Sequence, residues 1–224
     1  MSDFINTVDI IGEEELVNAL LQGTLSGAFC DNTLKMIGRY GLSNQQIQSV
    51  NCPLVETLGA GAFYDCDNLT DINLPLAKDL SKGEIFNSCE RLLKVVLPSA
   101  AYIGTRTFNQ NHKLKTIDLP KLEQLMFQAI SNCSTLIAII IRSSNVATAQ
   151  RSDFIGNTCY HFQGIVNETY NPNGDKDGYF YVPKDLIEDY KVATNWTIYA
   201  DQFRALEDYT VDGTITGELD ESKI

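Results

Sequence analysis

The chain has 224 residues, with 17 lysine and arginine residues against 29 aspartate and glutamate residues, and a formal net charge of −12 at pH 7. This length suffices for one domain with a sizeable core, or for one domain with a small appendage. The acidic excess lies outside residues 51–142, where nine acidic and nine basic side chains balance. Proteins that bind nucleic acid carry a basic stripe along the phosphates, so the charge pattern argues against a nucleic-acid partner.

Residues 1–36 are predicted to form a helical N-terminal cap. Glu13, Glu14 and Glu15 precede an apolar run, and acidic side chains are favourable in the first turn of a helix. Gly23 is expected to end this helix, which would cover the start of the following domain, while a partner-binding helix is the alternative. No basic region precedes an apolar stretch, and no apolar run approaches ~20 residues, so neither a secretory signal nor a membrane span is expected.

A pattern of the form Leu-x-x-Ile-x-Leu-Pro recurs at intervals of 22 or 23 residues within residues 37–160. The residues in its final position are Pro53, Pro75, Pro98, Pro120 and Arg142. A fixed period in this range is typical of a solenoid, in which each repeat forms one coil and neighbouring coils share a core. The apolar residues two apart predict a short strand, and proline ends it because it has no N–H group.

Two further positions of the repeat are predicted to be in the core. An aromatic or aliphatic side chain recurs at Phe63, Phe86, Phe108 and Ile130. The position three residues later holds Cys66, Cys89, Asn111 and Cys133. We interpret these cysteines as small buried thiols rather than as disulfides or metal ligands, and we expect Asn111 to bond the turn backbone. In a degenerate last repeat, Phe154 is expected to take the aromatic position.

Side chains between the apolar positions of each strand point away from the core and are the first candidates for a binding surface. They differ from coil to coil, as a recognition surface would, although an ordinary solvated face also varies. The candidates are Thr70, Asp71, Asn73, Lys94, Val96, Lys115, Thr116 and Asp118, together with Ile140.

Residues 161–208 are predicted to form a C-terminal cap with a strand at Tyr179–Val182 and one or two helices after Pro183. Tyr179, Tyr181 and Trp196 are candidates for recognition because aromatic side chains often anchor interfaces. For Trp196, we favour packing on the last coil, and recognition is the alternative. Residues 209–224 are an acidic tail, which is either an extension or a strand that pairs with a neighbour in an assembly.

The sequence predicts no catalytic constellation, metal site or cofactor motif. Residues 173–178 match the first half of a calcium loop, but Lys184 stands where such a loop needs a bidentate glutamate, so we favour a solvated turn. Cys159 and His161 are close in sequence, and we favour packing over nucleophilic catalysis for this pair. The chain is therefore expected not to be an enzyme and to need no cofactor.

The Leu-x-x-Ile-x-Leu-Pro strand, the Ile-Gly turn and the Phe-x-x-Cys anchor of residues 37–160 resemble the BspA-like class of leucine-rich repeats. Residues 142–148 and 178–183, with Trp196, resemble the closing part of such proteins in Firmicutes and their phages and prophages. The resemblance implies a β-rich leucine-rich-repeat solenoid of about five to six coils. It would carry a helical N-terminal cap and a small α/β C-terminal cap.

The resemblance also implies a non-enzymatic protein-interaction module. We expect a structural or host-recognition component of a phage or phage-like particle, assembled in the bacterial cytoplasm, since no export signal is visible. A bacterial cell-surface adhesin or secreted binding protein is the alternative. The expected partners are other protein subunits of the particle or a host surface receptor, and an oligomer is compatible with either.

Overall fold

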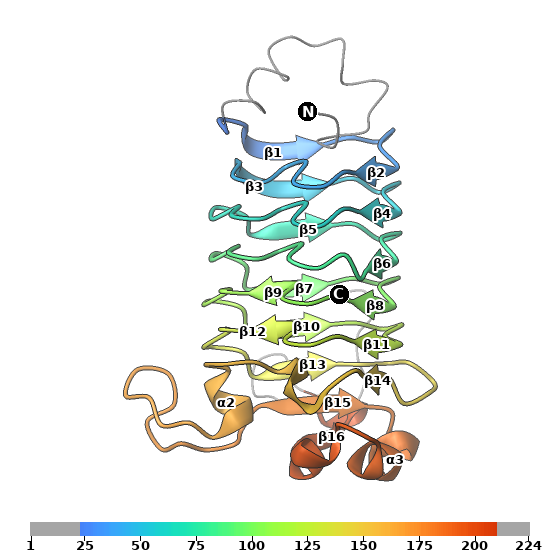
Figure 1. The fold of residues 1–224 in the computed structure, drawn as a ribbon, viewed down its shortest axis with the longest axis vertical. Helices are drawn as coiled ribbons and strands as arrows, with labels where there is room; N and C mark the ends of the chain where they lie inside the picture. The colour runs from blue at the N-terminus through green and yellow to red at the C-terminus, as the bar shows by residue number, and fades with distance from the viewer. Residues whose placement is uncertain (1–22, 210–224) are drawn as a thin grey trace.

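The computed structural model describes residues 23–209, which form a stack of short coils along one long axis (Figure 1). Strands of neighbouring coils pair in parallel on more than one face of the stack. The predicted repeat solenoid is thereby confirmed. The helix predicted before Gly23 and the tail predicted after residue 209 lie outside the described residues.

The Leu-x-x-Ile-x-Leu segments form the face that we call the main sheet. Its strands are β1 (Ser26–Cys30), β3 (Gln46–Asn51), β5 (Asp71–Asn73), β7 (Lys94–Val96), β10 (Thr116–Asp118), β13 (Ala138–Ile140), β15 (Tyr179–Val182) and β16 (Phe203–Ala205). The ladder runs in the order β1-β3-β5 and again in the order β7-β10-β13-β15-β16, with no pairing between β5 and β7. The main sheet therefore continues past residue 160 into the C-terminal segment.

The second face carries the Ile-Gly turn position, which holds Gly38, Gly59 and Gly104 in three repeats and Ser81, Met126 and Gln150 in the others. Its strands are β2 (Met36–Ile37), β4 (Thr57–Leu58), β6 (Asp79–Leu80), β8 (Tyr102–Ile103), β11 (Gln124–Leu125) and β14 (Thr148–Ala149). A Cβ on Gly104 would lie 2.5 Å from the carbonyl oxygen of Ser81 in the neighbouring coil, so the backbones approach too closely for any side chain. This close approach explains why a residue without a side chain stands at Gly104. A third, shorter sheet pairs β9 (Phe108–Asn109) with β12 (Ile130–Ser131).

The two predicted core positions stack from coil to coil. The rings of Phe63 and Phe86 lie 5.2 Å apart, and those of Phe86 and Phe108 lie 5.8 Å apart, both nearly parallel and fully buried. At the position three residues later, each side chain donates a hydrogen bond to a backbone carbonyl of the preceding coil, as Cys66, Cys89, Asn111 and Cys133 all do. The buried-thiol interpretation and the expected backbone bond of Asn111 are both confirmed.

The last repeat differs from the sequence expectation. A parallel bridge pairs Ile130 with Ile155, so that Ile155 takes the position predicted for Phe154. Phe154 instead faces the C-terminal segment, where its ring lies 4.6 Å from that of Trp196. The physical reason is the longer link of this repeat, which displaces the aromatic side chain by one position.

The C-terminal segment packs helical turns against the end of the stack (Figure 1). These elements are η2 (Ser152–Phe154), α2 (Tyr160–Gln163), η3 (Lys184–Leu186), α3 (Ile187–Val192), η4 (Thr197–Gln202) and η5 (Leu206–Asp208). Trp196 has no exposed surface, and its Nε1 donates a hydrogen bond of 2.7 Å to the carbonyl oxygen of Ala147. Packing on the last coil, the interpretation favoured from the sequence, is therefore confirmed, and the inclusion of Trp196 among the candidate recognition residues is wrong.

Candidate interaction surface

A hollow of about 510 Å³ lies on the outward face of the main sheet where β5 faces β7. Its lining residues are Thr70, Asp71, Ile72, Asn73, Leu93, Lys94, Val96 and Pro98, and we call this the β5–β7 hollow. Five of the predicted binding residues are among them. Sequence reasoning missed Ile72, Leu93 and Pro98. The sequence alone did not single out Leu93, because its repeat position holds Thr70 and Lys115 in two other coils but the equally apolar Ile137 in a third.

The hollow coincides with the longer repeat spacing and with a break in the ladder of the main sheet. The register pairs Thr57 with Asp79, 22 residues apart, and Asp79 with Tyr102, 23 residues apart. The extra residue falls in the coil between β5 and β7, which are also the two strands of the main sheet that do not pair.

The lining combines charged, polar and apolar groups on one surface. Leu93 is 55% exposed, which is high for a large apolar side chain. The Oγ1 of Thr70 donates a 2.6 Å hydrogen bond to Oδ2 of Asp71, which orients this carboxylate, and Lys94 is exposed on the next strand. An exposed leucine beside a carboxylate and an ammonium group is a surface suited to a protein partner rather than to a reaction.

The other half of the same face is not open. Lys115 is exposed, but Thr116 keeps 8% of its surface and Asp118 only 1%, so neither belongs to an exposed binding surface as predicted. Oδ1 of Asp118 accepts a 2.6 Å hydrogen bond from Nη1 of Arg142, which lies over it. Burial raises the pKa of the Asp118 carboxyl, and the positive charge of Arg142 opposes that rise.

Tyr179 and Tyr181 stand at the C-terminal end of this face, both half-buried. The guanidinium carbon of Arg204 lies 4.1 Å from the ring centroid of Tyr179, within cation–π distance. The ring of Tyr181 meets that of Tyr209 edge-on at 4.9 Å. The structure thus brings the two predicted tyrosines together with Arg204 and Tyr209, which sequence reasoning did not single out, and separates them from Trp196.

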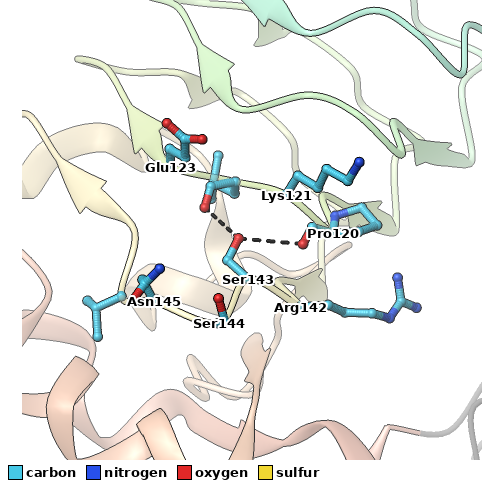
Figure 2. A pocket seen from close by; sticks show the side chains of 9 residues that line it. Pro120, Lys121, Glu123, Arg142, Ser143, Ser144 and Asn145 are labelled. Carbon is cyan, nitrogen blue, oxygen red and sulfur yellow. Dashed lines mark hydrogen bonds between the residues drawn. The ribbon is translucent and has the colours of Figure 1, made fainter.

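A second hollow of about 410 Å³ lies between the coil that contains Pro120 and the loop after β13 (Figure 2). Ser143 holds this loop in place, because its Oγ donates a 2.6 Å hydrogen bond to the carbonyl oxygen of Leu122. Figure 2 shows Arg142 and Asn145 on opposite sides of Ser143. None of the residues that line this hollow was predicted as a binding residue, and its small polar side chains are those of an ordinary loop.

The side chains that were weighed as catalytic or metal-binding groups do not gather in one site. Cys159 is buried, whereas His161 Nδ1 lies 2.6 Å from Oδ1 of Asp177, so the thiol and the imidazole face different surroundings. Burial raises the pKa of the Cys52 and Cys66 thiols to about 12, which suppresses the thiolate form. Across residues 23–209, no three His, Cys, Asp or Glu side chains gather as metal ligands would. In the same range, no helix has the length and apolar character needed to cross a membrane.

The parallel coils, the stacked phenylalanines and the recurring cysteine define a leucine-rich-repeat solenoid. Six copies of the family described as the BspA type leucine rich repeat region match residues 35–161. The chain belongs to this family. Leucine-rich-repeat modules of this type bind other proteins. A comparison with curated proteins gave no match.

Solved structures with similar folds come from several bacteria. A leucine rich cell surface protein from Faecalibacterium prausnitzii is 26% identical over 53% of this chain and 32% of its own, with a TM-score of 0.46. A leucine rich repeat protein from T. pallidum is 23% identical over 56% and 59% of the two chains, with a TM-score of 0.44. One from Eubacterium ventriosum is 16% identical over 59% and 43%, with a TM-score of 0.41. The chain spans less than two thirds of the length of each.

Proposed function

We propose that this chain is a non-enzymatic protein-interaction module whose partner docks on the β5–β7 hollow. The observation that carries the proposal is the convergence of Asp71, Leu93 and Lys94 on one open surface of an otherwise regular stack. Binding would remove the apolar surface of Leu93 from water, and the charges of Asp71 and Lys94 would determine the orientation and the identity of the partner. Catalysis has less support, because the buried thiols and the His161–Asp177 pair do not meet in a common site.

We further propose that the chain acts in a phage or phage-like particle, in a structural or host-recognition role. Its partner would then be a particle subunit or a host surface receptor. The support is the likeness of residues 142–148 and 178–183 to the closing part of such proteins. Immunogold labelling and proteomics of purified particles test this setting. Stoichiometric signal on particles supports it, whereas protein on intact cells and none on particles would replace it with the cell-surface adhesin.

The docking site is tested by a pair of matched variants. Leu93→Asp places a charge in the hollow, and Val192→Asp makes the same change at a 77% exposed aliphatic residue on α3, far along the chain. Wild type and both variants are used to capture proteins from the source strain and its particles, followed by quantitative mass spectrometry and rebinding of the purified partner.

The expected partner binds wild type and Val192→Asp equally and is lost with Leu93→Asp. Because both side chains are already exposed, neither change should lower the melting temperature appreciably. Equal capture of every protein by all three baits would remove the hollow as the docking site.

A further inference from the structure

The junction between β5 and β7, which we call the seam, lacks the backbone hydrogen bonds that flank every other junction of the main sheet from β3 to β15. At those junctions, one bond precedes the paired strands and one follows them. Between β7 and β10, the N–H of Lys115 donates to the carbonyl oxygen of Leu93 at 2.9 Å, and the N–H of Leu97 donates to that of Asp118 at 3.0 Å. Within residues 23–209, neither equivalent bond joins β5 to β7.

The missing bonds leave four main-chain groups without a partner in the described part of the chain. They are the carbonyl oxygen of Thr70 and the N–H of Leu93 at one end of the seam, and the N–H of Leu74 and the carbonyl oxygen of Val96 at the other. Each end therefore offers one donor and one acceptor. A peptide group carries the same two functions, so a single peptide group can satisfy both groups at one end.

The seam also exposes a core side chain. Ile72 holds the strand position that points into the core, yet it is only half-buried and lines the β5–β7 hollow. The side chains at the equivalent position of other coils keep 2% or less of their surface exposed, and they are Val50, Val95, Ile117 and Ile139. An apolar side chain of a partner that reached between the strands would therefore contact Ile72 and remove its surface from water.

The length of the seam suits an extended polypeptide. Thr70 and Leu74 are four residues apart, and Leu93 and Val96 are three residues apart. At about 3.3 Å per residue, the two ends of the seam lie roughly 10–13 Å from each other. An extended segment of about four or five residues spans this distance and brings a peptide group to each end. A ligand with a single amide group reaches only one end, so the spacing favours a polypeptide over a small molecule.

We propose that the β5–β7 hollow binds an extended polypeptide segment of about five residues, which bonds the unpaired main-chain groups of the seam and turns a small apolar side chain toward Ile72. This recognition rests on the proposed docking site and states the chemistry that the site selects. Main-chain bonds supply affinity for any such segment. Sequence preference comes from the side chain that faces Ile72 and from charges complementary to Asp71 and Lys94, which are exposed on the two sides of the seam.

The probe for this proposal is a library of short linear peptides of random sequence, displayed on filamentous phage. The library is selected on the full chain, and peptides that also bind Leu93→Asp are removed. We expect the remaining peptides to bind Val192→Asp as tightly as wild type, because Val192 is on α3 and does not line the hollow. Failure to obtain any peptide that distinguishes wild type from Leu93→Asp would overturn the proposal.

Two N-methylated forms of each selected peptide test whether the main chain is recognised. In an extended segment, successive N–H groups point to opposite sides, so one form is methylated at odd positions and the other at even positions. The form that is methylated on the side facing the seam loses hydrogen bonds to the chain. We expect it to bind about tenfold more weakly than the other form, which is the matched control. Equal binding of the two forms would contradict main-chain recognition.

Hydrogen exchange measured by NMR follows the seam directly. The N–H of Leu93 has no acceptor within residues 23–209, whereas the N–H of Lys115 at the equivalent position is bonded. We expect the Leu93 amide to exchange faster than the Lys115 amide in the unbound chain, and to slow several-fold when a selected peptide is added. Slow exchange in the unbound chain, or exchange that the peptide does not change, would refute the proposal.

These results are separate from those of the protein capture. Loss of every natural partner from the capture experiment would count against the proposed function, whereas the peptide selection needs no natural partner. Failure of the peptides, with a captured protein that still depends on Leu93, would leave the hollow as a docking site for a folded surface and remove only the extended segment.

Discussion

Asn111 occupies a position that is cysteine in three other coils, and replacing it tests how the coils are joined. Its Nδ2 donates a 2.9 Å hydrogen bond to the carbonyl oxygen of Phe86, and its Oδ1 accepts a 3.0 Å hydrogen bond from the N–H of Cys89. Asn111 has no exposed surface. Asn111→Ala leaves one buried carbonyl and one buried N–H without partners, whereas Asn111→Cys still offers a thiol to the carbonyl, as Cys133 does to Phe108.

The magnitudes follow from the two bonds. Each buried polar group left unpaired costs about 1–3 kcal/mol, so Asn111→Ala should lower the free energy of unfolding by about 2–6 kcal/mol. Asn111→Cys replaces the amide oxygen that accepts from the N–H of Cys89 by a weaker sulfur acceptor, as in the contact of Cys133 with the backbone of Asn111, and should cost about 1–3 kcal/mol at most. The control is Asn73→Ala, which removes an exposed amide that also bonds the neighbouring coil through Asn51, and should change stability by about 0.5 kcal/mol or less.

The assay is equilibrium unfolding in urea, followed by far-UV circular dichroism for the stack and by the fluorescence of Trp196, the single tryptophan, for its C-terminal end. Coincident transitions are needed before the free energies are compared, because solenoids do not always unfold as one unit. An Asn111→Ala variant within about 0.5 kcal/mol of wild type, or an Asn111→Cys variant less stable than Asn111→Ala, would refute the reasoning.

Three further outcomes are expected. In the native protein, Cys30 alone should react readily with a thiol reagent, because it is exposed and the other five cysteines are buried; fast reaction of two or more thiols would contradict this. Gly104→Ala should cost about 1–3 kcal/mol in thermal or chemical unfolding, because its Cβ meets the backbone of Ser81; wild-type stability would show that the coils can move apart. Burial raises the folded-state pKa of Asp118 above its ordinary value of 3.8. The free energy of unfolding of wild type therefore falls as the pH rises through this pKa, because the folded state holds the proton more tightly than the unfolded state. The free energy of unfolding of Asp118→Asn, relative to wild type, should therefore increase between about pH 4 and pH 7, and a flat or falling difference would contradict the direction of that pKa shift.

The sequence was sufficient for the solenoid and for its core. Each core position occurs in several coils, so Phe63, Phe86 and Phe108 reinforce one assignment, and a single degenerate repeat does not obscure it. The exchange of cysteine for Asn111 even predicted the backbone hydrogen bond that both side chains make. Such positions are set by contacts between neighbouring repeats, about 22 residues apart, and these contacts recur with the same geometry.

Exposure on the outward face was decided by the tertiary structure. Asn73 and Asp118 hold equivalent positions in their strands, yet Asn73 is exposed and Asp118 is 1% exposed, because Asp118 bonds Arg142 and lies in the half of the sheet near Tyr181. For Trp196, the sequence already favoured packing on the last coil, and the tertiary structure supplied its hydrogen-bond partner, the carbonyl oxygen of Ala147. A repeat determines which side of a strand a residue occupies. Whether that side meets water depends on contacts with segments outside the repeat, and these obey no period.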